Sequence, residues 1–210
     1  LGTVALGKEA QEEIEVANPG RKTVKIAFEN VAEGLVIEPG EVASGKVAVV
    51  SVVQKPVEGL WGSNTYYATP VVLDSKGKTI SKGTPLSFTF FTIEDFSDYT
   101  TAQKVQAPKP MFDKSTVFAG NLKSSSKPVD VVFKFTNSSN KPLVIHKVDC
   151  PEGVVCKSFP AETKGSGKGT MTFTFDPSKA GEGEVSLMIS LTTNSPSRPV
   201  VNLFIAAIIK

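Results

Sequence analysis

The most regular feature of the chain is an alternation of apolar and polar residues, interrupted by short runs of turn residues. Residues 129–136 read VDVVFKFT, a period of two that predicts a strand with one buried face. Residues 137–140 (NSSN) favour a turn, because Asn and Ser side chains bond nearby backbone. After Pro142, residues 143–148 (LVIHKV) predict the returning strand of a hairpin.

The same layout occurs a second time, near the N-terminus. Residues 12–17 (EEIEVA) alternate, residues 18–20 (NPG) predict a turn, and residues 23–28 (TVKIAF) return. The segments EIEVANPGRKTVKI and VFKFTNSSNKPLVI therefore look like two copies of one hairpin. We interpret them as an internal repeat with a period of about half the chain.

Further segments rich in Val, Ile, Phe and Thr follow at intervals of about 8–12 residues, a spacing typical of all-β folds. In the first half they are residues 1–6, 35–38, 46–54, 65–73 and 85–93. In the second half they are residues 116–122, 154–159, 170–175, 185–193 and 199–209. The sequence therefore predicts an all-β protein of two tandem immunoglobulin-like β-sandwich domains, with roughly seven strands each.

The pattern breaks in residues 94–110. Residues 98–105 predict one or two helical turns with Ser97 as the N-cap, and residues 107–110 (APKP) predict a stiff extended spacer. A boundary between two domains is therefore expected in this region.

We expect an N-terminal domain at residues 1–106, which includes a linker at 94–106, and a C-terminal domain at residues 107–210. The linker carries more large apolar side chains than a fully solvated segment would. We therefore predict that aromatic residues and prolines of this region pack at the domain junction, namely Phe96, Tyr99, Pro108 and Pro110.

Composition narrows the possible functions. The 210 residues are 40% hydrophobic and 21% charged, as in ordinary globular proteins. The 23 basic and 21 acidic residues give a net charge of +2, too balanced for a nucleic-acid-binding surface. No apolar run reaches the roughly 20 residues that a membrane-spanning helix needs. The chain shows no signal peptide and begins at Leu1 rather than Met, which is compatible with removal of a leader.

Several short motifs of the second half carry a family resemblance. They are Phe118 and Gly120 in TVFAGNL, FKFTN at 133–137, PLVI at 142–145, and FTFDP at 173–177. With them, residues 115–209 resemble a bacterial family of immunoglobulin-like domains of unknown function, numbered fifteen seventy-three. That family is similar to the sandwiches of the ASPM–SPD-2–Hydin and major-sperm-protein types. The resemblance is weak in the first half, implies an exported protein of the periplasm or cell surface, and brings no established activity.

Cys150 and Cys156 are the only cysteines, joined by the loop PEGVV where the family carries a Cys-Gly-Cys-Thr-like motif. In an exported protein such a pair predicts a disulfide. Closing so short a loop stabilises a fold by about 2 kcal/mol in the chain-entropy model. Two free or buried thiols are an alternative, and a metal site that adds His146 is another.

Catalytic patterns find little support in the sequence. His146 is the only histidine, and Asp149 is expected on the opposite face of its strand. Residues 165–170 (GSGKGT) resemble a phosphate-binding loop only in part, because Gly169 follows the lysine and a strand follows the loop. We therefore expect no enzymatic activity, no catalytic residue, no cofactor and no bound metal.

Trp61, Tyr66 and Tyr67 lie close together in the sequence and are candidates for a ligand or partner surface. Such side chains suit sugar or peptide binding because they offer a large rigid area with a polar edge. Packing in the core or between the domains is the alternative.

The function that we expect is that of an exported, non-enzymatic structural or protein-interaction module. Its partner would be another protein or a cell-surface component, with no nucleic acid and no membrane-spanning segment involved. One alternative is a carbohydrate-binding module that uses the three aromatic residues above. Another is a periplasmic pilus chaperone-like protein, in which Leu86, Phe88 and Phe90 would accept a donated strand.

Overall fold

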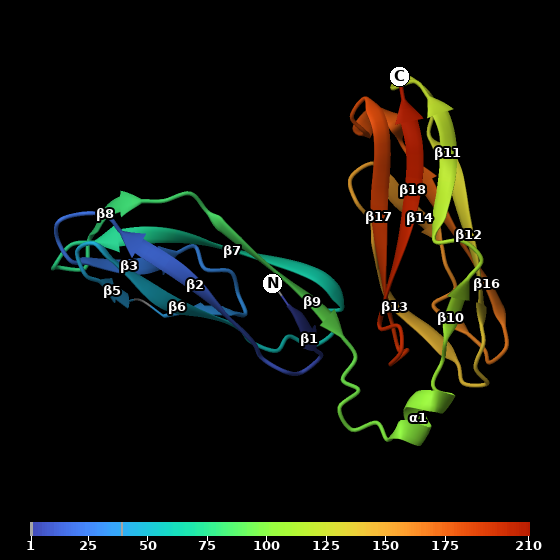
Figure 1. Ribbon diagram of the computed structural model, residues 1–210, viewed down its shortest axis with the longest axis horizontal. Coiled ribbons are helices and arrows are strands. Elements are labelled where there is room, and N and C mark those ends of the chain that lie inside the picture. The colour runs from blue at the N-terminus through green and yellow to red at the C-terminus, as the bar shows by residue number, and fades with distance from the viewer. Residues whose placement is uncertain (1, 39) are drawn as a thin grey trace. The chain divides into compact units, whose positions relative to one another are not determined.

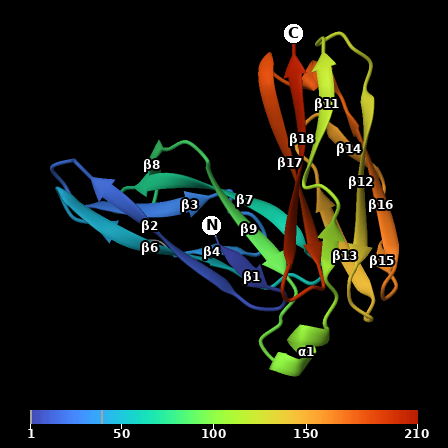
Figure 2. The ribbon, with the colours of Figure 1, turned by 45° about the vertical axis from the view of Figure 1, so that its right-hand side comes forward.

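The computed structural model describes residues 2–38 and 40–210 and consists almost entirely of β-strands (Figure 1). The chain divides into two compact units, Leu1–Thr92 and Ile93–Lys210. Each unit contains two sheets, and the layers of both are visible when the view is turned (Figure 2). The predicted fold class, two tandem immunoglobulin-like β-sandwiches, is therefore confirmed.

The first unit combines a six-stranded sheet with a three-stranded one. The larger sheet consists of β1 (Thr3–Ala5), β3 (Val24–Glu29), β5 (Gly40–Val42), β7 (Gly62–Leu73), β8 (Thr79–Lys82) and β9 (Leu86–Ile93). Its order is β1-β9-β7-β3-β5, and β8 also pairs with β7. The smaller sheet consists of β2 (Ala10–Asn18), β4 (Leu35–Ile37) and β6 (Lys46–Gln54), in the order β2-β6-β4.

The core of the first unit lies between these sheets. Phe88 and Phe90 alternate with more exposed residues along β9 and are only 3% and 1% exposed. Tyr66 of β7 meets Phe90 edge-to-face, with the ring centroids 6.0 Å apart. Val52 of β6 is fully buried in the same cluster. The period-two pattern of the sequence thus buries one face of each strand.

The second unit combines a four-stranded sheet with a five-stranded one. The first consists of β10 (Pro110–Phe112), β12 (Val129–Asn137), β14 (Val154–Ser158) and β16 (Lys168–Phe175), in the order β10-β12-β16-β14. The second consists of β11 (Thr116–Leu122), β13 (Leu143–Asp149), β15 (Glu162–Thr163), β17 (Gly183–Thr193) and β18 (Val200–Ile209). Its order is β11-β18-β17-β13-β15, with β11 parallel to β18.

Phenylalanines fill the core of the second unit. Phe133 of β12 and Phe173 of the neighbouring β16 are edge-to-face, with ring centroids 5.8 Å apart. Phe135 stacks at a tilt on Phe112 of β10, at 5.0 Å. Phe133, Phe135 and Phe173 are each at most 1% exposed. The phenylalanines of the FKF and FTF motifs therefore lie in the core.

The two repeated segments are not hairpins, because β2 and β12 lie in one sheet of their unit whereas β3 and β13 lie in the other. What the two copies share is a buried asparagine at the end of the first strand. In the first unit, Asn18 ends β2 and its Nδ2 donates to the carbonyl oxygens of Lys22 (2.8 Å) and Val42 (2.9 Å). Its Oδ1 accepts a bond from the backbone N–H of Gly20 at 3.0 Å. One side chain therefore holds the turn and ties it to β5.

Asn137 does the same at the end of β12. Its Nδ2 donates to the carbonyl oxygens of Lys141 (2.7 Å) and Thr163 (3.3 Å), and its Oδ1 accepts from the backbone N–H of Ser139 (3.3 Å). The sequence offsets within the turn, two and four residues, are those of Asn18. The two sandwiches therefore share a structural device as well as a strand pattern.

The helix before the second sandwich begins later than predicted. Helix α1 spans Thr101–Gln106, and its N-cap is Thr100 rather than Ser97. Thr100 and Gln103 form a reciprocal capping box, which satisfies two backbone donors at once. Ser97 instead follows a local turn in which its N–H donates to the Asp95 carboxylate at 2.9 Å.

The segment that we predicted as part of the N-terminal domain is placed with the second unit, because the division falls at Thr92/Ile93 rather than at residue 106. The hydroxyl of Ser139 donates to the carbonyl oxygen of Gln106 at 2.7 Å. Ala107 is buried, and the carbonyl of Lys109 accepts from the N–H of Ser138 at 3.0 Å. Pro110, expected in a spacer, opens β10 and pairs with Asn137.

Candidate interaction surfaces

The outer side of the three-stranded sheet in the first unit carries a row of valines. Val47, Val49 and Val53 alternate along β6 with the buried Val50 and Val52, and Val36 of β4 pairs with Val53. Val47 is 58% exposed, Val49 57% and Val36 41%. We call Val36, Val47, Val49 and Val53 the valine face.

The valine face is bordered on one side by acidic side chains. On β2, the residues with the outward direction are Gln11, Glu13, Glu15 and Ala17, here called the β2 row. Glu15 lies directly opposite Val49, and Glu13 opposite Ser51. The Gln11 amide donates to the Ser51 hydroxyl at 3.1 Å, so the two rows are linked across the strands. The surface is thus an apolar strip with carboxylates along one edge.

The aromatic residues predicted as a binding surface do not share one face. Tyr66 is 8% exposed and belongs to the core, whereas its neighbour Tyr67 is 57% exposed. Adjacent residues of a strand point to opposite faces, so the two rings of β7 are separated by the sheet. Trp61 is half-buried in the turn before β7. Packing therefore accounts for Tyr66, and only Tyr67 is freely available.

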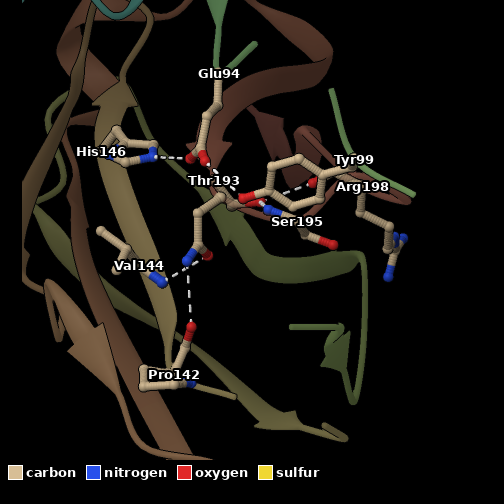
Figure 3. A network of polar contacts seen from close by, with 9 residues as sticks. Glu94, Tyr99, Pro142, Val144, His146, Thr193, Ser195 and Arg198 are labelled. Carbon is tan, nitrogen blue, oxygen red and sulfur yellow. Dashed lines mark hydrogen bonds and ion pairs between the residues drawn. The ribbon is translucent and has the colours of Figure 1, made fainter. Parts of the chain in front are cut away.

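A network of polar contacts joins the segment after β9 to the second sandwich (Figure 3). The Glu94 carboxylate lies 3.0 Å from Nε2 of His146 on β13 and accepts a bond from the Tyr99 hydroxyl at 3.2 Å. Burial, helped by the negative charge of Glu94, raises the pKa of Tyr99. Tyr99 also meets Phe96 edge-to-face, with centroids 5.4 Å apart. These contacts give Glu94, Tyr99 and His146 a positioning role for the segment.

The same network continues into the loop after β17 (Figure 3). Asn194 accepts from the N–H of Val144 (2.8 Å) and donates to the carbonyl of Pro142 (3.2 Å). Arg198 donates to the carbonyl oxygen of Pro110 at 2.9 Å. Pro108 and Pro110, expected at a junction, are buried within the second unit.

Tyr99, Gln103, Gln106, Ala107, Pro108, Lys141, Pro142 and Asn194 line a pocket of about 360 Å³ within the second unit. Its walls mix amide and proline groups with the Lys141 side chain. Without a convergent set of charged or nucleophilic groups, this composition argues for packing of α1 more than for chemistry.

Residues 111–208 match the family described as protein of unknown function (DUF1573). The match runs from β10 to β18, and it confirms the resemblance inferred from the strand motifs. The second sandwich is therefore called the DUF1573 domain below. No curated protein matches the sequence.

Among solved structures similar to this chain at low sequence identity, the first described below shares its fold. A protein of unknown function from Porphyromonas gingivalis W83 has a TM-score of 0.71 and 14% identity, over 97% of this chain and 93% of that one. The ASH/PapD-like domain 7 of human CEP192 has a TM-score of 0.40 and 8% identity, over 56% of this chain and 94% of that one. The MSP-domain protein SSP-19 of Caenorhabditis elegans has a TM-score of 0.30 and 7% identity, over 42% and 89%.

Cys150 and Cys156 are both free thiols in this structure, so the predicted disulfide is not formed. Both are half-buried and pack against the core of the DUF1573 domain. Burial, together with the nearby Cys156 thiol, raises the pKa of Cys150 to about 11. Burial also raises the pKa of Cys156. Half-buried thiols whose pKa is raised are poor nucleophiles, which argues for a structural role rather than for nucleophilic chemistry.

The loop between the cysteines borders a second pocket of the DUF1573 domain, about 460 Å³ in volume. Val155, which is 65% exposed, contributes to its wall together with Pro128 and Thr174. Lys157 closes one side by pairing with Asp130 at 2.8 Å, a contact that holds the pKa of the Asp130 carboxyl below its usual value. The pocket is open and its rim carries charges of both signs.

In the part of the chain that the structure describes, no group of three or more His, Cys, Asp and Glu side chains could hold a metal ion, and His146 pairs with Glu94 instead. Within residues 2–38 and 40–210, no helix is long and apolar enough to cross a membrane.

The valine face was missed by the sequence reasoning, although a signal was present. Residues 46–54 read KVAVVSVVQ, with valine at both odd- and even-numbered positions. A strand with one buried face leaves every second residue outward, so such a run must expose some valines unless both faces are covered. The run therefore predicts exposed valines on the surface as well as buried valines in the core.

Proposed function

We propose that this chain is a non-enzymatic interaction module of an exported bacterial protein, and that it binds another protein or cell-surface component through the valine face. The observation that supports this most directly is the exposure of Val47 (58%) and Val49 (57%) on a regular strand. On the outward row of β6 only Ser51 interrupts the valines. A group of exposed apolar residues with a polar border is typical of interaction sites, whereas single exposed apolar residues are common.

Energy and geometry agree with this role. Fully burying a valine side chain contributes about 1.5 kcal/mol, so covering several neighbouring valines is a source of affinity. The side chains stand on paired strands rather than on a loop, which fixes their positions without ordering cost on binding.

Export is part of the proposal. Its support is the match of residues 111–208 to a family whose resemblance implies export, and a cysteine pair that suits an oxidising compartment. When the bacterial gene is expressed in its own host, the protein is expected in the periplasmic or surface fraction. Recovery in the cytoplasm alone would contradict this part.

The two alternative functions have less support. A carbohydrate platform needs Trp61, Tyr66 and Tyr67 on one surface, but Tyr66 lies in the core. A strand-accepting groove needs several accessible apolar residues along β9, but only Leu86 of the three candidates is exposed (36%), whereas Phe88 and Phe90 are 3% and 1% exposed.

A photocrosslinking experiment tests the interaction role. A photoreactive phenylalanine analogue replaces Val49 in the host bacterium, and the covalent adducts formed on illumination are resolved by electrophoresis. The matched control places the analogue at Ile80, which is 64% exposed on β8 of the same unit. We expect discrete high-mass adducts from position 49 and few from position 80.

Equal adduct formation from both positions would mean that any exposed apolar residue is contacted, and the valine face would lose its special role. Absence of adducts at position 49 in cells that contain the folded protein would defeat the proposal.

A further inference from the structure

The β2 row makes one edge of the valine face negatively charged. Glu15 stands opposite Val49 and Glu13 opposite Ser51 in the strand register. Paired strands lie about 4.8 Å apart and outward residues recur every ~6.8 Å. A surface that covers Val49 is therefore brought within reach of both carboxylates. The residues that form the face and the row include no lysine or arginine.

A second copy of this chain is a poor occupant for that reason. If two valine faces pack with β2 on β2, Glu13 and Glu15 meet the same carboxylates of the other copy, and like charges brought together cost affinity. If they pack with β2 on β4, the carboxylates meet Val36 and lose hydration without gaining a cation. The acidic edge therefore selects against self-association.

We infer that the valine face binds a protein segment whose apolar stripe is bordered by lysine or arginine side chains. This inference rests on the proposed function and names the partner's chemistry. The stripe covers Val47 and Val49, while its basic residues reach Glu13 and Glu15 at the edge. Ion pairs at such a rim contribute modestly to affinity, but they decide which partner is accepted and how fast it associates.

The test uses the purified full chain and two fluorescent amphipathic peptides as probes. One probe places lysines beside a leucine stripe, and the other has the same pattern with glutamate in place of lysine. Binding is measured by fluorescence anisotropy at low and at high NaCl concentration. We expect the leucine–lysine peptide to bind more weakly as salt rises, because salt screens exposed charges. The leucine–glutamate peptide is expected not to bind.

Variants locate the binding to this surface. Glu13→Lys with Glu15→Lys is expected to weaken the leucine–lysine peptide about tenfold or more, the effect of two exposed ion pairs replaced by repulsion. Its matched control is Glu41→Lys with Glu58→Lys, two exposed acidic residues of the first unit outside the face. Val47→Thr with Val49→Thr keeps β-branched side chains and is expected to weaken binding, whereas Ile80→Thr is not. Thermal unfolding of each variant confirms that the unit remains folded.

Equal binding of the two peptides, an equal loss in the control pair, or a stable homodimer of the wild-type chain would each overturn the inference. Adducts from position 49 in cells, together with no preference for the lysine peptide, would leave the interaction role standing and remove only this account of the partner. No adducts at position 49 would remove the interaction role itself.

Discussion

At the scale of single residues, adjacent residues of a strand have different roles because their side chains point to opposite faces of the sheet. Tyr66 is a core residue and Tyr67 is a surface residue, and the period of two already predicts that they diverge. Cys150 and Cys156, which are near each other in the sequence, both pack against the core of the second unit. Their oxidation state does not follow from the fold, because it depends on the redox potential of the compartment.

The cysteine pair predicts a difference between the disulfide-bonded and the reduced form of the protein. Protein isolated from an oxidising compartment is expected to carry the Cys150–Cys156 disulfide and to weigh two hydrogens less than the reduced chain. In the reduced form the pKa of Cys150 is raised from 9.0 to about 11, so folding favours the neutral thiol. That contribution is complete below pH 9 and is lost as the pH rises toward 11.

Urea unfolding at a series of pH values should therefore show an alkaline loss of stability in the reduced form that is smaller in the oxidised form. The oxidised form lacks the titrating thiols and serves as the control. Two alkylatable thiols in protein from the periplasm or cell surface would show the disulfide prediction to be wrong.

At the scale of elements, the long periodic strands could be predicted, whereas several of the very short ones could not. The predicted ranges 46–54 and 116–122 coincide with β6 and β11. β10 and β15 have three and two residues, too few for a periodic pattern, and each exists because tertiary packing supplies its partner strand. The interaction surface depends on which face of β6 is covered, and this is a property of the assembled sandwich.

One glycine illustrates how β16 is fitted to its neighbour. Gly169 lies opposite Phe135 of β12, and a Cβ at this position would stand 2.2 Å from the ring. Phe135 is 1% exposed and stacks on Phe112, so its ring has no free space to move into. Gly169→Ala is therefore expected to destabilise the DUF1573 domain by about 1–3 kcal/mol, the usual cost of overpacking.

The matched control is Gly181→Ala, where nothing lies within 4 Å of the added carbon and the backbone needs no positive φ. Chemical denaturation of the two variants, followed by tyrosine or far-ultraviolet signals, measures the difference. Equal stabilities would show that Phe135 can shift at little cost.

At the scale of the whole molecule, the chain repeats one architecture with two separate cores. The cluster around Phe133 and the cluster around Phe90 share no residue. The duplicated strand–turn–strand segment predicted this organisation, because each copy needs its own sheets to bury its apolar face. The domain boundary lies earlier in the chain than predicted, because the segment before β10 is hydrogen-bonded to the second sandwich through Glu94 and Gln106.

Separate cores predict separate responses to mutation, and the two buried asparagines are matched probes of this. Asn18→Ala removes donors from the carbonyls of Lys22 and Val42 in the first unit, and Asn137→Ala does the same to those of Lys141 and Thr163 in the second. Leaving buried carbonyls unpaired costs about 2–4 kcal/mol, which lowers the midpoint of a domain of this size by roughly 10 °C or more.

Calorimetry of the full chain should therefore resolve into two transitions, with Asn18→Ala lowering one and Asn137→Ala lowering the other. The exposed Asn121 of β11 supplies the control, because Asn121→Ala should move neither transition appreciably. A single transition that both buried substitutions lower by the same amount would mean that the two sandwiches unfold as one cooperative body, and the independence of the cores would then be refuted.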